Sequence, residues 1–273
     1  MVKGLAFFRR TAGAQQTTQQ AVATWVRRLA FYLILLALWQ GIVALGIWPG
    51  YVLPGPLDVA SNLVQGIGSG LYLRAALVSL ERLAIGYCIS LCIGIILGSL
   101  IGRVRILEET VGSLILGLQA LPSVCWLPLA ILWFGLSEQA IIFVVIMGAL
   151  FSITLSVDAG VKNTPPIYLK AGRTLGVRGI ALALHVMLPA AMPTVLNGLK
   201  QGWSFAWRSL MAGELLFFTL SLGNLLEEGS NLQDTSQVIA VMLLIIIIGV
   251  TIDTLVFGQL ERRVRARWGL QGA

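Results

Sequence analysis

Charged residues are scarce in this chain, and three of them fall inside long apolar runs: Arg208, Glu214 and Asp253. A charge within a membrane-crossing segment is costly, and such residues often mark the path of an ion or a substrate. A guanidinium there would give a passing anion an attractive but weak site. We therefore expect Arg208 to line a conduit. The alternatives are a pair with an acid on a neighbouring helix, or a side chain that snorkels to the interface.

Glu214 follows Arg208 by six residues. Six residues turn an α-helix by about 600°, which leaves the two side chains roughly 240° apart, so we expect no direct pair between them. For Glu214 we expect a structural or gating role, or a hydrogen bond to another helix, and Trp207 is a further candidate for the path. Arg82 follows Glu81 at the start of an apolar run, which favours an interfacial anchor. Asp253 is expected to pair with a basic neighbour.

The residues needed for catalysis are missing from the sequence. A single histidine, His185, cannot build a histidine-based metal site, and the chain has no GxxxxGK[ST] loop to cradle ATP phosphates. We expect no enzymatic activity, and no metal or cofactor bound by this chain. If the protein's work is driven by ATP, the ATP and Mg²⁺ must be bound by another chain.

Composition indicates an all-α bundle of membrane helices. Of the 273 residues, 57% are hydrophobic and 11% are charged, whereas soluble domains typically carry about 25% charged residues. A spanning helix needs roughly 20 apolar residues. Pro122 and Pro128 should each weaken a turn of the third apolar segment, as hinges or as packed kinks. With Glu214, both are further candidates for the translocation path. The six apolar segments are 29–47, 83–101, 111–134, 140–157, 202–220 and 238–257.

The positive charges are distributed unevenly over the connections between these segments. The net charge is +7, and 16 of the 19 lysines and arginines fall in segments that share one side if the N-terminus is cytoplasmic. This asymmetry favours six spans with both termini in the cytoplasm. Because the basic residues are scattered over short membrane-flanking segments, we expect contact with lipid and none with nucleic acid.

The connection 158–200 is too long for a minimal loop. Thr164 precedes two prolines, which suits a helix start, and Gly176 suits a helix end. Between them, 167–175 should form a short amphipathic helix. Such a helix can dock into a groove of a partner protein or lie on lipid headgroups.

Several motifs resemble a known family. The order Lys170-Ala171-Gly172, Gly176, Val186 and Leu188-Pro189 resembles the EAA signature of the inner-membrane permease subunits of ABC importers. Further resemblances to the family lie in 53–59, in 212–215, and in 121–138, which is similar to the third-span signature of the nitrate/sulfonate/taurine/bicarbonate branch.

The resemblance implies a type I ABC importer permease fold of about six spans, in which a coupling helix at about 163–178 docks on an ATP-binding subunit. The implied coupling residues are Lys170, Ala171, Gly172, Gly176, Leu188 and Pro189. The family usually has Glu where this chain has Lys170, and Ala where it has Gly172. The usual salt link to the ATPase would therefore be replaced by an acid on the partner, or by a contact without an ion pair.

The partners implied by the resemblance are two ATP-binding subunits, a second permease copy in a homodimer, and a periplasmic or lipoprotein substrate-binding protein. We expect a cytoplasmic tail at 1–28, a transmembrane permease domain at 29–265 and a C-terminal tail at 266–273, in a bacterial inner membrane. The expected function is ATP-driven import of a small anion such as nitrate, bicarbonate, taurine or an aliphatic sulfonate. The alternative is an ATP-independent secondary transporter or channel.

Overall fold

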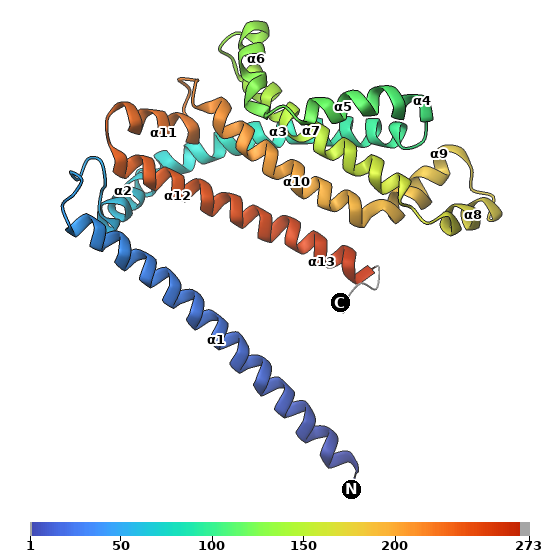
Figure 1. Ribbon diagram of the computed structural model, residues 1–273, viewed down its shortest axis with the longest axis horizontal. Coiled ribbons are helices and arrows are strands. Elements are labelled where there is room, and N and C mark those ends of the chain that lie inside the picture. Colours follow the sequence, from blue (N-terminus) through green and yellow to red (C-terminus); the bar gives the residue numbers. More distant parts are fainter. Residues whose placement is uncertain (1, 268–273) are drawn as a thin grey trace.

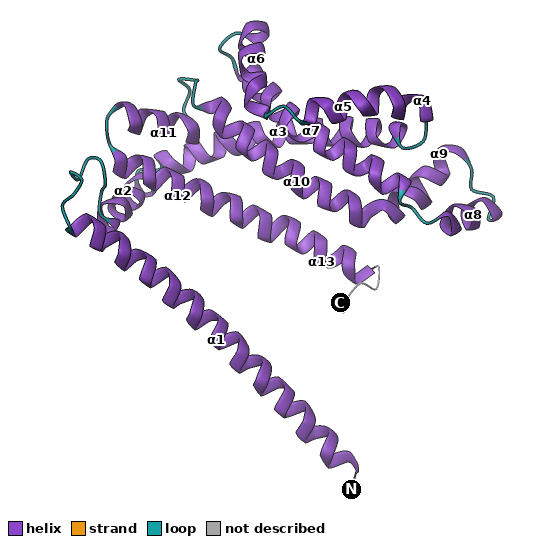
Figure 2. Ribbon diagram, in the orientation of Figure 1, coloured by secondary structure: helices purple, strands orange, loops and turns teal. Residues whose placement is uncertain are grey.

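The computed structural model describes the backbone of residues 2–267 and the side chains of residues 23–179, 181–264 and 266. Within this part of the chain the elements are helices joined by turns, without a strand (Figure 2). The α-helices are α1 Val2–Ala44, α2 Pro56–Gly68, α3 Leu71–Ile101, α4 Arg105–Leu107, α5 Ser113–Gln119, α6 Leu127–Phe134, α7 Glu138–Lys162, α8 Pro166–Thr174, α9 Gly179–Leu182, α10 Leu188–Glu214, α11 Leu222–Asn231, α12 Thr235–Ile252 and α13 Gly258–Arg267. Short π or 3₁₀ segments are η1 Glu108–Gly112, η2 Ser123–Trp126, η3 Ala183–Met187 and η4 Asp253–Phe257.

Helices α3, α7 and α10 form the centre of the bundle, and glycines bring α3 close to α7 (Figure 1). A Cβ added to Gly86 would lie 2.6 Å from Val145 Cγ1, and one added to Gly94 would lie 2.8 Å from Ile153 Cγ2. Small residues at such seams let helix backbones approach closely. The glycines of α3 therefore serve packing within the chain.

Four segments are long and apolar enough to cross a membrane: Ala23–Ala44, Leu71–Ile101, Glu138–Lys162 and Thr235–Val264. A fifth crossing is available if Arg105–Gln119 and Ser123–Phe134, which are bent by 102°, act as one span. The predicted segment 202–220 differs from the helix found there. Helix α10 begins at Leu188 and ends at Glu214, and it is absent from the apolar set because polar side chains such as Lys200, Arg208 and Glu214 interrupt it.

The second predicted segment also begins too late. Helix α3 starts at Leu71, directly after Gly70, whose φ of +76° ends the preceding turn. Residues 71–82 include Arg74, Glu81 and Arg82, and these charges hide the helix from a hydropathy pattern. The helix tolerates Arg82 because its guanidinium is paired with Glu214, which is buried, and with Glu138, which is exposed.

The two prolines of the third predicted segment differ in effect. The chain leaves helical geometry just before Pro122, which has ψ of 132° and precedes η2. Pro128 lies in the first turn of α6 and breaks no helix, because a proline there lacks only an N–H that has no intrahelical partner. The segment therefore has one break, at Pro122, and the second break expected at Pro128 is wrong.

Helix α1 stands apart from the bundle and contacts it mainly through α2 (Figure 1). The side chains of its apolar part, Ala23–Ala44, are exposed or half-buried. The helix is continuous from Val2, so the tail boundary at residue 28 stays a prediction. Residues 268–273 of the predicted C-terminal tail lie outside the described residues.

Candidate functional site

Helix α8 occupies the position of the predicted coupling helix. It begins at Pro166, as the proline signal indicates, and ends in a capping motif at Gly176, whose φ is +84°. The Gly176 N–H donates to the Arg173 carbonyl and the Val177 N–H donates to the Gly172 carbonyl, both at 3.0 Å. This pair of bonds is a Schellman motif, which satisfies carbonyls left open at a helix end. A side chain at Gly176 would strain the cap.

The two faces of α8 differ. Leu169 and Gly172 face the bundle, and a Cβ on Gly172 would lie 2.7 Å from Leu182 Cδ1 and 3.1 Å from Val186 Cγ2. An alanine at this position would require the ends of these two side chains to move. The opposite face is exposed and carries Ile167, Lys170, Ala171 and Arg173. Figure 1 shows α8 at one end of the bundle, beyond the ends of α7 and α10, which we call the α8 end.

The remaining predicted coupling residues, Leu188 and Pro189, lie in the first turn of α10. Both are half-buried. They directly follow η3, which contacts α8, and they are not part of the exposed face of α8.

At the opposite end of the bundle, the α11 end, Arg82 and Glu214 form a buried ion pair. Arg82 Nη1 lies 3.2 Å from Glu214 Oε1, and Arg82 Nη2 lies 2.8 Å from Glu138 Oε1. Arg82 is 4% exposed and Glu214 is 0% exposed. The expectation of an interfacial anchor for Arg82 is therefore wrong: a buried guanidinium needs acids from other helices, and α7 and α10 supply them.

Glu214 also joins α10 to the turn that begins α11. Its carboxylate accepts hydrogen bonds from the Ser79 hydroxyl at 2.7 Å and from the Gly223 N–H at 3.1 Å. The Leu222 N–H donates to Ser79 Oγ at 3.0 Å. We expected a structural role, a gating role or a hydrogen bond to another helix for Glu214. The structure contains the hydrogen bond to other helices. Near the middle of α10, Lys200 pairs with Asp253 of η4 at 3.1 Å, so Asp253 has the basic partner that was expected.

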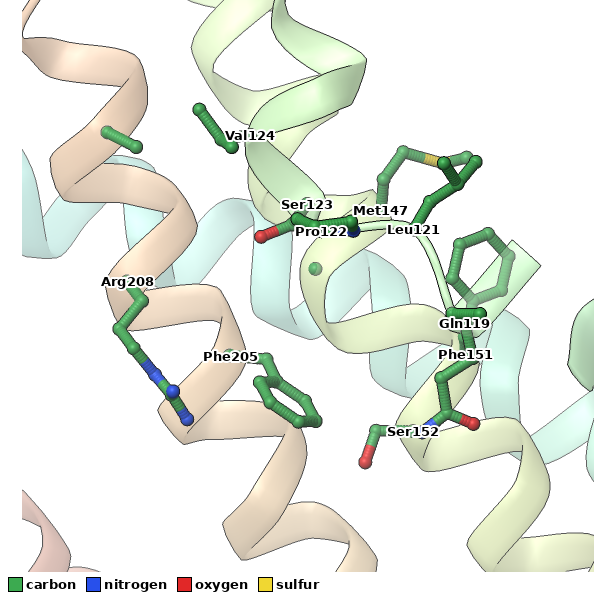
Figure 3. Close-up of a pocket in the computed structure, with 13 residues that line it drawn as sticks. Gln119, Leu121, Pro122, Ser123, Val124, Met147, Phe151, Ser152, Phe205 and Arg208 are labelled. Atoms are coloured by element: carbon green, nitrogen blue, oxygen red, sulfur yellow. The ribbon is translucent and has the colours of Figure 1, made fainter. Parts of the chain in front are cut away.

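Arg208 has different surroundings. It makes no ion pair among the described residues. Its Nε donates to the Ser204 carbonyl of its own helix at 3.1 Å, and its guanidinium carbon lies 5.0 Å from the centre of the Phe205 ring. Arg208 and Pro122 line the same cavity, between α10, α7 and the break before η2 (Figure 3).

The other path candidates lie elsewhere. Trp207 stacks on Trp203 with ring centres 6.5 Å apart, and its indole nitrogen lies 3.2 Å from where a Cβ of Gly249 would be, so it packs towards α12. Glu214 is enclosed at the α11 end. Pro128 is part of α6 and does not line the cavity.

Comparison with known proteins identifies the family. Residues 90–266 match the model of the binding-protein-dependent transport system inner membrane component. The chain belongs to this family. Relatives include an Escherichia coli protein whose name describes an aliphatic sulfonates transport permease, 30% identical over 90% of this chain and 94% of its own length. Another is the nitrate import permease of Synechococcus elongatus, 29% identical over 82% of this chain and 84% of its own.

Solved structures agree on the fold. The MetNI methionine ABC transporter in an inward-facing conformation superposes with a TM-score of 0.62 at 19% identity, covering 71% of this chain and 96% of that chain. This permease thus has the fold of an ABC importer membrane subunit, and its homologues are transport permeases rather than enzymes.

Some residues of the permease's charge network were missed by the sequence analysis. Ser79, Glu138 and Thr219 all contact the Arg82–Glu214 pair. Ser79 lies three residues before Arg82 and Thr219 five residues after Glu214, but Glu138 and the opposite charge of the pair are far away along the chain, so local spacing does not show the cluster. The one available signal was the number of charges in α3 and α10, which buried helices tolerate only when they are paired.

Proposed function

We propose that this permease is the membrane subunit of an ATP-driven importer of small anions of the nitrate, bicarbonate, taurine or sulfonate type, working in a bacterial inner membrane as a homodimer. Two copies of a separate ATPase bind ATP and Mg²⁺, and a substrate-binding protein delivers the anion at the α11 end. The family and the names of its relatives support the class of transport. The observation that carries the coupling to an ATPase is the exposed face of α8.

That face combines apolar and basic groups. Ile167 is 69% exposed and Leu175 is 82% exposed, and Lys170 and Arg173 lie exposed between them. An apolar helix face seated in a groove is a common mode of docking. Since α8 contains no acid, the groove that receives it is expected to offer carboxylates. Lys170 then takes the place of the family's usual glutamate with the charges of the ion pair reversed.

Movement of α8 has a short route into the bundle. Gly172 packs on Leu182 and Val186, which lead through η3 into α10. On the other side, the buried Thr164 hydroxyl donates to the Gly160 carbonyl of α7 at 3.0 Å. Because α7 and α10 are closely packed through glycines such as Gly202, closure of the ATPase pair would tilt both helices together. This makes α8 the input of a two-state element biased by a remote ligand.

The test is co-purification of the permease with the ATPase. Ala171 is exposed on α8, so Ala171→Asp adds a charge that repels an acidic groove without disturbing the core. We expect it, or deletion of 167–176, to abolish co-purification while the protein stays inserted in the membrane. The matched control is Ala60→Asp on an exposed position of α2, at the α11 end, which should co-purify as the wild type does. Unchanged co-purification of Ala171→Asp would refute the docking role.

Orientation is tested separately, in a variant without Cys88, Cys92 and Cys125, since all three are exposed. A cysteine introduced by Thr174→Cys should resist a membrane-impermeant thiol reagent added to intact cells. One introduced by Ser61→Cys, exposed on α2, should react. Labelling of the first variant from outside would place α8 on the wrong side for an ATPase.

A further inference from the structure

The cavity beside Arg208 has the features of a ligand site. Its volume is about 370 Å³, at the lower end of the roughly 300–1,000 Å³ typical of small-molecule sites. It lies between α10 and α7, under the break that separates α5 from η2 (Figure 3). Non-helical backbone at membrane depth is tolerated where it is buried in protein or lines a water-filled cavity. The break at Pro122 meets that condition.

Besides the Gln119 carboxamide, two polar groups at the cavity lack protein partners among the described residues. The first is the end of the Arg208 side chain, which has no carboxylate within ion-pair distance among the described residues. The second is the hydroxyl of Ser152, which is 2% exposed and whose buried Oγ has no hydrogen-bond partner. Both residues line the cavity, from α10 and α7 respectively (Figure 3). The Ser152 Oγ has less than 1 Å² of exposed surface, so the Arg208 guanidinium is the group that a ligand can reach without a rearrangement of the wall.

The rest of the wall is mainly apolar. Ser123 contributes a hydroxyl, which is already 2.6 Å from Ser209 Oγ. The apolar side chains around the cavity are Leu121, Val124, Met147, Phe151, Phe205 and Ala212. Apolar walls cannot replace the water lost by a bare inorganic anion, but they gain from covering a hydrocarbon chain.

We propose that this cavity is a transit site for an organic monoanion with a short apolar body, of the alkanesulfonate class, in preference to nitrate or bicarbonate. The sulfonate head meets the Arg208 guanidinium, and the alkyl chain lies against Phe151 and Met147. A single exposed arginine holds the head weakly enough for release, as a transit site requires. This inference rests on the proposed transport function and names its substrate class.

The test is equilibrium binding of ³⁵S-labelled butanesulfonate to the full-length permease in lipid nanodiscs, without the binding protein. We expect saturable binding that weakens at least about tenfold in Arg208→Gln, because a charge-assisted contact is lost. Arg74→Gln, at an exposed position of α3 outside the cavity, is the matched control and should bind as the wild type does. Affinity should rise from methanesulfonate to butanesulfonate, and nitrate should compete poorly.

Ser152→Ala is a second control. Its Oγ is closed off from the cavity, so this variant should bind butanesulfonate as the wild type does. Equal binding by wild type and Arg208→Gln, or nitrate competing as well as butanesulfonate, would overturn the proposal. The same preparations are assayed for ATPase co-purification. If co-purification still depends on α8 when binding is absent, the cavity assignment fails and the proposed function stands; if both are absent, the proposed function fails as well.

Discussion

Arg82 and Arg208 are both arginines of the central bundle, and their surroundings are opposite. Arg82 is 4% exposed and donates to Glu214, Glu138 and Thr219. Arg208 is exposed, and its one described hydrogen bond goes to its own helix. Both surroundings occur along α10, six residues apart. Glu214 pairs with Arg82 at the α11 end, and Arg208 lines the cavity.

The difference separates charges that hold the fold from charges available to a ligand. A charge within a membrane bundle is retained when partners compensate for its lost hydration. For Arg82 those partners are part of this chain. For Arg208 the only such partners among the described residues are the Ser204 carbonyl and the Phe205 ring, and no acid is in reach, so a counter-charge has to come from outside these residues, for example from lipid, a ligand or a second copy of the chain. The comparison thus assigns a structural role to the first arginine and leaves the second available to a ligand, in line with the transit site proposed above.

The largest expected effect is on the buried pair. Arg82→Met leaves the fully buried Glu214 carboxylate without its counter-ion, and we expect a loss of about 3–5 kcal/mol in the free energy of unfolding. Titration of the purified protein with sodium dodecyl sulfate in mixed micelles measures this change. An unfolding curve that matches the wild type would show that the pair does not hold the α11 end together.

A double variant sharpens the same point. Arg82→Met with Glu214→Met removes both charges, and replacing a buried pair by apolar residues is often close to neutral. We expect partial recovery, because the Gly223 N–H loses its acceptor and an unsatisfied buried donor costs about 1–3 kcal/mol. A double variant less stable than Arg82→Met alone would contradict this account.

The next effect concerns the close contact behind Glu214. A Cβ on Gly223 would lie 2.9 Å from the Glu214 carbonyl carbon and 3.0 Å from the Leu215 nitrogen. These are backbone atoms that cannot move aside cheaply, so Gly223→Ala should cost roughly 1–3 kcal/mol of unfolding free energy. Gly117→Ala is the control, because nothing lies within 4 Å of its added Cβ. The control should be unchanged or stabilised by up to about 1 kcal/mol, since alanine favours a helix.

Much of the α8 end follows from local sequence. The start at Pro166 and the end at Gly176 are set by backbone chemistry within a few residues of each position. The spacing argument that kept Arg208 and Glu214 from pairing is local too, and the two residues make no pair in the structure. The family, the all-helical fold and an ion pair of Asp253 with a basic residue were likewise predicted, and the structure identifies that residue as Lys200.

The α11 end could not be predicted in the same way. The partners of Arg82 come from α7, from α10 and from the turn before α11, so its burial depends on how distant helices pack. The position of Glu81 next to Arg82 favoured an interfacial anchor, because the sequence shows this neighbour and does not show the distant acids that pack against Arg82 in the fold. The cavity depends on the direction in which the chain turns at Pro122, which the proline alone does not determine.

A smaller loss of stability is expected when the second acid that pairs with Arg82, Glu138, is replaced. Glu138 is 64% exposed at 2.8 Å from Arg82 Nη2, whereas Glu214 is 0% exposed. Exposed ion pairs typically contribute about 0–1 kcal/mol, so Glu138→Gln should lower the unfolding free energy by less than about 1 kcal/mol. A loss as large as that of Arg82→Met would mean that Glu138 is as important as the buried acid, and the same detergent titration decides.

The smallest expected effect on stability is that of Arg208→Gln. No acid among the described residues depends on Arg208, so its removal leaves no buried charge uncompensated. The change in unfolding free energy should stay within about 0.5 kcal/mol, the range of substitutions away from packed or paired sites. A variant that unfolds like the wild type and has lost butanesulfonate binding would confirm the separation of roles. A loss comparable to Arg82→Met would show that Arg208 has a structural partner after all, and the two arginines would no longer differ in kind.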